Sequence, residues 1–109
     1  MEIIVIGGGL SGLISSILLA RNQWNVTLIE KKDYPFHRVC GEYISNEVIP
    51  FLKEHKLYPE ELSPVDITDF QLTDTSGRSM GMKLDLGGFG ISRYAFDHWL
   101  AKKAIETGV

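Results

Sequence analysis

The sequence has little of what several classes of protein require. Cysteine occurs once among the 109 residues, as Cys40, which excludes an internal disulfide and a metal cluster built from cysteines. The three histidines, His37, His55 and His98, share no close or helical spacing, so we expect no metal site. A single free cysteine fits a reducing compartment, and we expect the protein to be cytoplasmic.

Long hydrophobic runs and a dominant charge are also missing. The apolar stretches are far shorter than the ~20 residues of a membrane span, and the first one lacks the basic start and cleavage site of a signal peptide. The net charge of −3 gives no reason to expect nucleic-acid binding. With 44% hydrophobic residues and no repeats, the composition is that of an ordinary globular protein.

What the sequence does contain is a short apolar run followed at once by spaced glycines. Residues 3–6 are all β-branched, which predicts a strand buried on both faces. Gly7, Gly9 and Gly12 follow with the spacing of a dinucleotide-binding turn. Gly7 permits the tight turn, Gly9 removes a Cβ that would keep a pyrophosphate off the backbone, and Gly12 allows close helix packing. The helix start then directs N–H groups at an anion.

The following residues complete a βαβ unit. Apolar periodicity predicts a helix over 12–21, and residues 26–29 form a second apolar strand that ends at Glu30. Glu30 lies 23 positions after Gly7, close to the ~20 at which an acidic residue accepts hydrogen bonds from the adenosine ribose. A plain glycine-rich turn would explain the glycines but not the helix, the strand and the carboxylate together.

The middle of the chain leaves this unit. Residues 31–37 are polar and predict a loop at the carboxyl end of the second strand, where ligands of open α/β sheets bind. Ser45 is the expected cap of a helix carrying residues 48–52. Pro50 lies past the first turn of such a helix, so the segment either kinks or begins its regular helix nearer Pro50. Residues 56–64 predict a loop with at most one helical turn.

A change to alternating polarity indicates an antiparallel hairpin, with strands at 66–73 and 80–86 and a turn at 76–77. Residues 87–92 are a short extended piece whose three glycines let the backbone pass close to something, either the cofactor or nothing more than a loop. A helix from Ser92 to Thr107 follows, with most of its aromatics in the core, and Gly108 ends it.

Three stretches, in this order and at these intervals, resemble the FAD-dependent oxidoreductases of the p-hydroxybenzoate hydroxylase class. They are the glycines with Glu30 and Lys31, residues 38–42 (Arg-Val-Cys-Gly-Glu), and residues 90–100 (Gly-Ile-Ser-Arg-x-x-Phe-Asp-x-x-Leu). The class includes aromatic and polyprenyl-phenol hydroxylases, flavin-dependent halogenases and geranylgeranyl reductases. A Cys-Gly pair after the basic residue makes the geranylgeranyl reductase-like branch the most similar. The resemblance extends over residues 3–109, and it is specific for FAD and unspecific for substrate.

The resemblance implies a set of cofactor-binding residues. Gly7, Gly9 and Gly12 are expected on the FAD pyrophosphate and Glu30, followed by Lys31, on its adenosine ribose. Arg38 and Arg93 are expected near the pyrophosphate and the ribityl chain. The Cys-Gly pair, Cys40 and Gly41, is expected alongside the flavin. A bidentate guanidinium suits a diphosphate better than a lysine does.

No catalytic residue is identified. Glu42 fits a solvated loop acid, and Asp97 fits a carboxylate in the first turn of the last helix, where the helix dipole favours it.

The predicted fold class is α/β: a Rossmann-like FAD-binding βαβ unit with an inserted antiparallel hairpin. A doubly wound domain needs more parallel strands than two, so we interpret residues 1–109 as the N-terminal part of an FAD/NAD(P)-binding domain. Residues 65–91 would start a substrate-side antiparallel segment of a larger two-domain flavoprotein. The chain would then be a proteolytic remnant or a shortened protein. Alone, it is expected to be inactive, to bind FAD weakly or not at all, and to associate with a second copy or with the missing segment.

The predicted function is that of an FAD-dependent oxidoreductase, of hydroxylase (monooxygenase) or prenyl reductase type. It would take electrons from NADH or NADPH and act on an aromatic or isoprenoid-like small molecule. An NAD(P)-dependent dehydrogenase would share the opening unit, but the hairpin after the second strand favours the FAD class. A non-catalytic nucleotide-binding fragment is the third possibility. The sequence does not reveal the substrate, because the flavin carries the chemistry.

Overall fold

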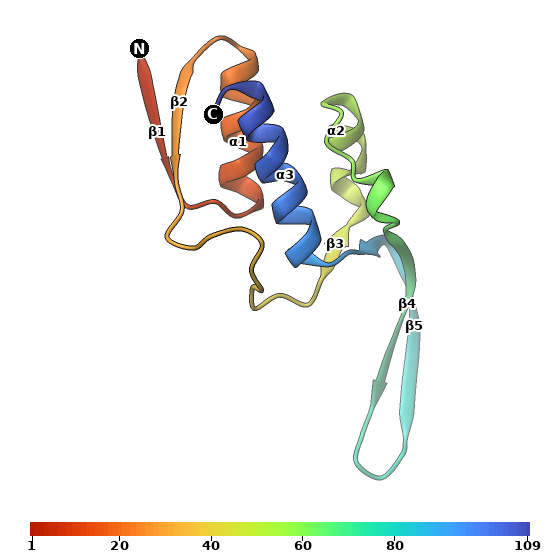
Figure 1. Ribbon diagram of the computed structural model, residues 1–109. Helices are drawn as coiled ribbons and strands as arrows, with labels where there is room; N and C mark the ends of the chain where they lie inside the picture. The colour runs from red at the N-terminus through yellow and green to blue at the C-terminus, as the bar shows by residue number, and fades with distance from the viewer. The chain divides into compact units, whose positions relative to one another are not determined.

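The computed structural model describes all 109 residues, which form two compact units. The first unit comprises Met1–Cys40 and Ser92–Val109, and the second comprises Gly41–Ile91. The first contains β1 (Glu2–Ile6), α1 (Leu10–Arg21), β2 (Asn25–Ile29) and α3 (Arg93–Thr107) (Figure 1). The second contains β3 (Tyr43–Ser45), the 3-10 turn η1 (Asn46–Val48), α2 (Ile49–Glu54), the 3-10 turn η2 (Glu60–Leu62), β4 (Val65–Thr73) and β5 (Ser79–Gly90).

The first unit is built on the predicted βαβ motif. β1 and β2 pair in parallel over five positions, from Glu2 opposite Asn25 to Ile6 opposite Ile29. α1 connects them, as a crossover between parallel strands requires. Glu30 follows the last residue of β2 directly, so the predicted unit and the place of its carboxylate are confirmed.

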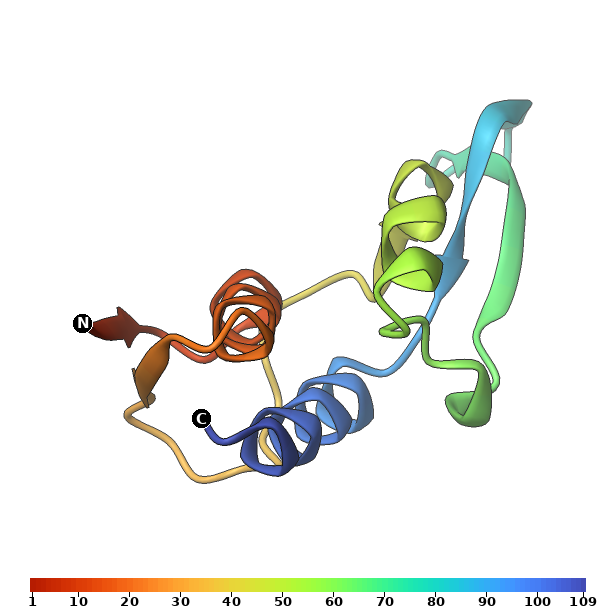
Figure 2. The same cartoon turned by 90° about the horizontal axis from the view of Figure 1, so that it is seen from above.

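The core of the first unit lies between its two helices. α1 and α3 lie side by side in both views (Figures 1 and 2). Apolar residues four positions apart line the contact, because that spacing keeps them on one helix face. Those that are buried are Leu13 and Ile17 of α1 and Phe96, Leu100 and Ala104 of α3.

The expectation that β1 is buried on both faces is wrong. Ile4 is 60% exposed and Ile6 84% exposed, whereas Ile3 and Val5 are half-buried. Side chains alternate between the two faces of a strand, and α1 covers only one of them. The other face, with Ile29 of β2 52% exposed, stands open to solvent within these residues.

The second unit is a three-stranded antiparallel sheet in the order β3-β5-β4. The predicted hairpin is confirmed, with Phe70 opposite Met82 and Leu72 opposite Met80. Asp74 closes its turn by accepting hydrogen bonds from the backbone N–H of Ser76 and of Arg78 (2.9 and 3.0 Å).

The glycines after the hairpin continue β5 to Gly90, and their close neighbour is the chain itself. A Cβ on Gly88 would lie 2.4 Å from the Tyr43 ring and 2.6 Å from the Ile44 carbonyl oxygen. One on Gly87 would lie 2.9 Å from the Ile67 carbonyl oxygen. The piece is extended, as expected, so the alternative of a mere loop is wrong. The pairing with β3 was not predicted, because the three residues of β3 give no alternation from which a neighbouring strand could be recognised.

The helix ends follow local chemistry. α2 begins at Ile49 with Pro50 in its first turn, so the second of the two interpretations of Pro50 is correct. Ser45 does act as a cap, but of the preceding η1, where its hydroxyl accepts from the Glu47 N–H (3.4 Å). Ser92 caps α3, and Gly108 ends it at φ +99°. None of these helices has the length and apolar character that crossing a membrane requires.

We predict that the 109 residues, purified alone, associate. Both strands of the first sheet are edge strands, and they present unpaired backbone groups beside Ile4 and Ile6, which recruits another chain. Light scattering should show a mass above one chain, and Ile4→Lys should lower it. Ile105→Lys is the matched control, since Ile105 is 72% exposed on a helix. A monomer for the unaltered chain would contradict the prediction.

Candidate dinucleotide site

The glycine turn joins the end of β1 to the start of α1. Gly7 has φ +102°, a conformation that favours glycine, and its N–H donates to the Ile29 carbonyl oxygen (2.8 Å). Gly9 is the N-cap of α1, and no side chain caps this end. The first N–H groups of the helix are therefore open to an anion, which the helix dipole also favours.

The three motif glycines differ in what the protein itself demands of them. A Cβ on Gly12 would lie 1.8 Å from the Gly7 carbonyl oxygen, so the helix could not pack here with any other residue. A Cβ on Gly9 would meet nothing closer than Cζ of Arg38 at 3.8 Å, an ordinary contact. Packing explains Gly12, as predicted, while the open side of Gly9 is left for a ligand.

Gly8 has a role that the motif did not indicate. Its N–H donates to Oε2 of Glu30 (2.9 Å), and its carbonyl oxygen accepts from the Tyr34 hydroxyl and from Nη2 of Arg38 (2.9 Å). A Cβ here would lie 1.9 Å from the Tyr34 hydroxyl oxygen, so a larger residue would displace the Tyr34 side chain. The unbroken triplet 7–9 was the available signal, because the motif alone requires only the first and third of these glycines.

Glu30 holds the turn from the end of β2. Besides Gly8, its carboxylate accepts from the Lys32 N–H (3.1 Å) and forms an ion pair with Arg38 (3.2 Å). The hydrogen bond from the Gly8 N–H is the main cause that lowers the pKa of Glu30, and Arg38 adds to it against the opposing effect of desolvation. The carboxylate stays ionised, and its side chain is only 10% exposed.

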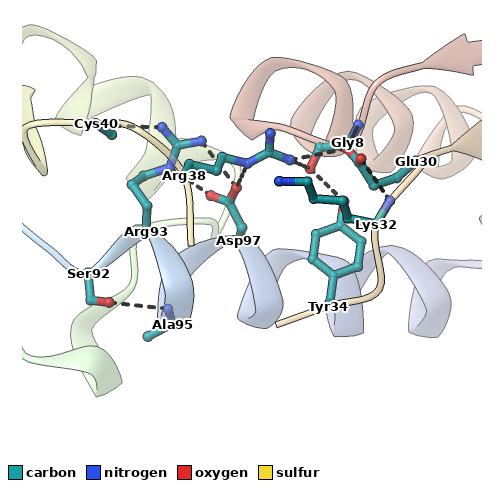
Figure 3. Close-up of polar contacts among 10 residues, drawn as sticks. All are labelled: Gly8, Glu30, Lys32, Tyr34, Arg38, Cys40, Ser92, Arg93, Ala95 and Asp97. Carbon is teal, nitrogen blue, oxygen red and sulfur yellow. Dashed lines mark hydrogen bonds and ion pairs between the residues drawn. The ribbon is translucent and has the colours of Figure 1, made fainter. Parts of the chain in front are cut away.

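Arg38 and Arg93 meet at Asp97, as Figure 3 shows. Nε of Arg38 donates to Oδ2 of Asp97 (2.5 Å), while Arg93 donates from Nε to Oδ1 (2.7 Å) and from Nη2 to Oδ2 (3.1 Å). Asp97 is 2% exposed and is the fifth residue of α3. Placing it in the first turn for the helix dipole was therefore wrong. The four-residue spacing from Arg93 was the signal for an ion pair.

Both arginines are held in the charged form. Desolvation would lower the pKa of Arg38, but hydrogen bonds to Asp97 and Glu30 outweigh it and raise the pKa. The hydrogen bond to Asp97 is also the main cause that raises the pKa of Arg93.

A groove of about 350 Å³ lies beside this cluster. The ring of Phe36 lies below two cations, with its centroid 4.5 Å from Cζ of Arg38 and 5.3 Å from Nζ of Lys32. The groove therefore offers a cationic, partly aromatic surface to an anion. Its lining residues are Glu30, Lys31, Lys32, Phe36, His37, Arg38, Val39 and Arg93.

The structure brings most of the predicted site residues into one unit. Lys31 lines the groove and is exposed. Cys40 is exposed, with its Sγ 3.6 Å from Nη1 of Arg93. Gly41 begins the second unit, and a Cβ there would meet no atom within 4 Å. The first unit thus holds every predicted cofactor residue except Gly41.

Comparison with known proteins agrees with this geometry. Residues 5–48 match the family of NAD(P)-binding Rossmann-like domains. The flavin-dependent halogenase armH4 of Armillaria mellea is 29% identical over 120 residues, which cover 98% of this chain and 22% of the halogenase. An uncharacterized protein of Methanosarcina barkeri is 25% identical over 115 residues, and the match covers 98% of this chain and 27% of that protein. The chain thus spans about a quarter of the length of these curated relatives.

Solved structures of other proteins share the fold. A geranylgeranyl bacteriochlorophyll reductase-like protein from Thermoplasma acidophilum superposes with a TM-score of 0.74 and 23% identity, over 98% of this chain and 28% of that one. The predicted fold class is confirmed, and so is the resemblance to the FAD-dependent class: the chain has the Rossmann-like fold of the FAD-binding region found in such proteins.

We predict that Gly12→Ala and Gly9→Ala differ sharply in stability. The Gly12 methyl group would overlap a backbone oxygen, which costs about 1–3 kcal/mol or more of unfolding free energy. The Gly9 methyl group has room, so its cost should stay near the ~1 kcal/mol of a less favourable N-cap. Urea denaturation of the two variants measures the difference. Equal losses would contradict the assignment of Gly12 to packing and Gly9 to a ligand.

We also predict that Glu30 contributes stability that depends on pH. Its pKa is lower in the folded state than the ordinary value of 4.5. The contribution is therefore fully present above that value and is lost as the pH falls through the lower folded-state pKa. Urea denaturation of the unaltered chain and of Glu30→Gln, between about pH 3 and pH 7, should show their difference shrinking with acid. A difference that is independent of pH would contradict this.

Proposed function

We propose that the chain is the dinucleotide-binding part of an FAD-dependent oxidoreductase. The observation that carries the proposal is the Arg38 guanidinium lying beside the open side of Gly9, at an uncapped helix start. A diphosphate needs both features: backbone N–H groups on one side and a fixed cation on the other. Asp97 and Glu30 keep that cation in place.

Individual residues take the following roles in this proposal. The backbone of Gly7, Gly9 and Gly12 binds the diphosphate, and Arg38 and Arg93 neutralise its charge. Glu30 binds the adenosine ribose. The remaining contacts with the cofactor come from Lys31, Cys40 and Gly41.

Bound FAD would supply the redox chemistry, and the electron donor that we propose is NADH or NADPH. The residues of this chain bind the dinucleotide and orient it, and we assign none of them a catalytic step. The substrate class that we propose is an aromatic or isoprenoid-like small molecule, with hydroxylation or reduction as the reaction. The name of the flavin-dependent halogenase armH4 supports a flavin, and the name of the reductase-like protein indicates a different reaction.

We further propose that residues 1–109 are the N-terminal part of the FAD/NAD(P)-binding domain and that residues 65–91 begin a substrate-side segment. The share of the relatives' length that the chain spans supports this. So does the sheet β3-β5-β4, which is antiparallel and separate from the parallel pair β1-β2.

An NAD(P)-dependent dehydrogenase is the second candidate, because the matching family is defined by NAD(P) binding. The observation against it is the antiparallel unit inserted between β2 and α3, where a classic dehydrogenase domain continues with βαβ units.

We predict that Gly9→Val abolishes FAD binding in the intact protein, because the side chain would occupy the space of the diphosphate. Glu30→Ala should weaken binding by about 1–3 kcal/mol, the range for a hydrogen bond to a charged group. Flavin absorbance and fluorescence quenching measure both. Gly81→Ala is the control, since a Cβ there makes only an ordinary contact, 3.6 Å from the Phe70 carbonyl oxygen.

The same titrations separate the two candidates. Unaltered protein that binds FAD and retains it through purification supports the flavoprotein. Protein that binds NADPH but not FAD would overturn the proposal in favour of the dehydrogenase.

A further inference from the structure

Asp97 connects two basic residues that lie far apart in the sequence. It lies between the guanidinium groups of Arg38 and Arg93 in Figure 3, and both of its oxygens accept hydrogen bonds from them. Arg93 uses Nε and Nη2 together, which is the bidentate geometry of strong arginine–carboxylate pairs. One buried carboxylate therefore fixes two cationic side chains, one from the loop after β2 and one from the start of α3.

Without this carboxylate the arrangement would not persist. Two guanidinium groups held this close repel each other, and each arginine side chain gains rotational freedom when it is released. Arg38 would keep its hydrogen bonds to Glu30 (3.2 Å) and to the Gly8 carbonyl oxygen (2.9 Å), and its contact with the Phe36 ring. Arg93 would lose the two hydrogen bonds, from Nε (2.7 Å) and from Nη2 (3.1 Å), that it donates to Asp97.

The bond to Asp97 also sets which end of Arg38 faces the glycine turn. Because Nε is bound to Asp97, the far end of the guanidinium points at the turn. Both Nη1 and Nη2 lie 4.0 Å from the position of a Cβ on Gly9. Nη2 already donates a hydrogen bond to the Gly8 carbonyl oxygen. Nη1 is therefore the nitrogen left to donate to a ligand oxygen at Gly9.

We propose that Asp97 is a positioning residue for a diphosphate ligand: it holds Arg38 and Arg93 with their charges toward the glycine turn and touches no ligand itself. This inference rests on the proposed FAD function. With 2% of its surface exposed, Asp97 lies behind the guanidinium groups. The single negative charge of Asp97 opposes the phosphates, but it is paired with two guanidinium groups, and it pre-organises both of them for the ligand.

The test compares ligands with and without a diphosphate. In the intact protein, Asp97→Asn should weaken binding of FAD and of ADP by about 10- to 100-fold, the range for lost charged hydrogen bonds. Adenosine, which carries no phosphate, should bind within about twofold of the unaltered protein, because its contacts do not involve the arginines. Asp74→Asn is the matched control: it removes the exposed Asp74–Arg78 ion pair of the hairpin turn and should change none of the three affinities.

Each outcome decides between the claims. Loss confined to FAD and ADP supports the inference, whereas unchanged affinities, or an equal loss for adenosine, would overturn it and leave Asp97 with a structural role. Unaltered protein that binds neither FAD nor ADP would instead overturn the proposed function and the inference with it.

Should Asp97→Asn not fold, Asp97→Glu takes its place, because it keeps the charge and moves the carboxylate by one methylene. Weaker ADP binding at an unchanged thermal midpoint supports the inference, and unchanged ADP binding overturns it.

Discussion

The arrangement of the first unit depends on the close approach of α1 to the end of β1. Gly12 lies against the Gly7 carbonyl oxygen with no room for a Cβ, and this contact sets the distance between helix and strand. It also decides where the first turn of α1 lies relative to the loop after β2. Once the helix start is fixed there, its unpaired N–H groups and the groove lined by Arg38 and Arg93 belong to the same small region.

A chain of charged contacts carries this arrangement across the sequence. Glu30 at the end of β2 binds the glycine turn through Gly8 and binds Arg38, which in turn binds Asp97 of α3. Three segments that share no secondary structure are thereby held together by two carboxylates. Arg38 also donates to the Gly8 carbonyl oxygen, so the loop after β2 is tied directly to the glycine turn as well.

The parts of the fold that follow local rules could be predicted from the sequence. The glycine spacing, the change from helical to alternating periodicity, the helix start near Ser92 and the helix end at Gly108 each depend on a few neighbouring residues. Each is found in the structure. The parts that depend on distant partners could not. β3 is three residues long and exists because β5 pairs with it, and the role of Asp97 depends on Arg38, which is 59 positions away. Periodicity carries no information about such pairs.

The errors about exposure have the same origin. A run of β-branched residues predicts a strand that two layers cover, yet Ile4 and Ile6 face solvent because only α1 packs on this sheet. The first unit therefore buries one face of its sheet, and the core that results is small. A small core gives a small free energy of unfolding. A ligand that binds only the folded state raises this free energy by RT ln(1 + [L]/Kd), which is then a substantial share of the total. Under the proposed function, the charged cluster at Asp97 would link the folding of the first unit to dinucleotide binding at its glycine turn.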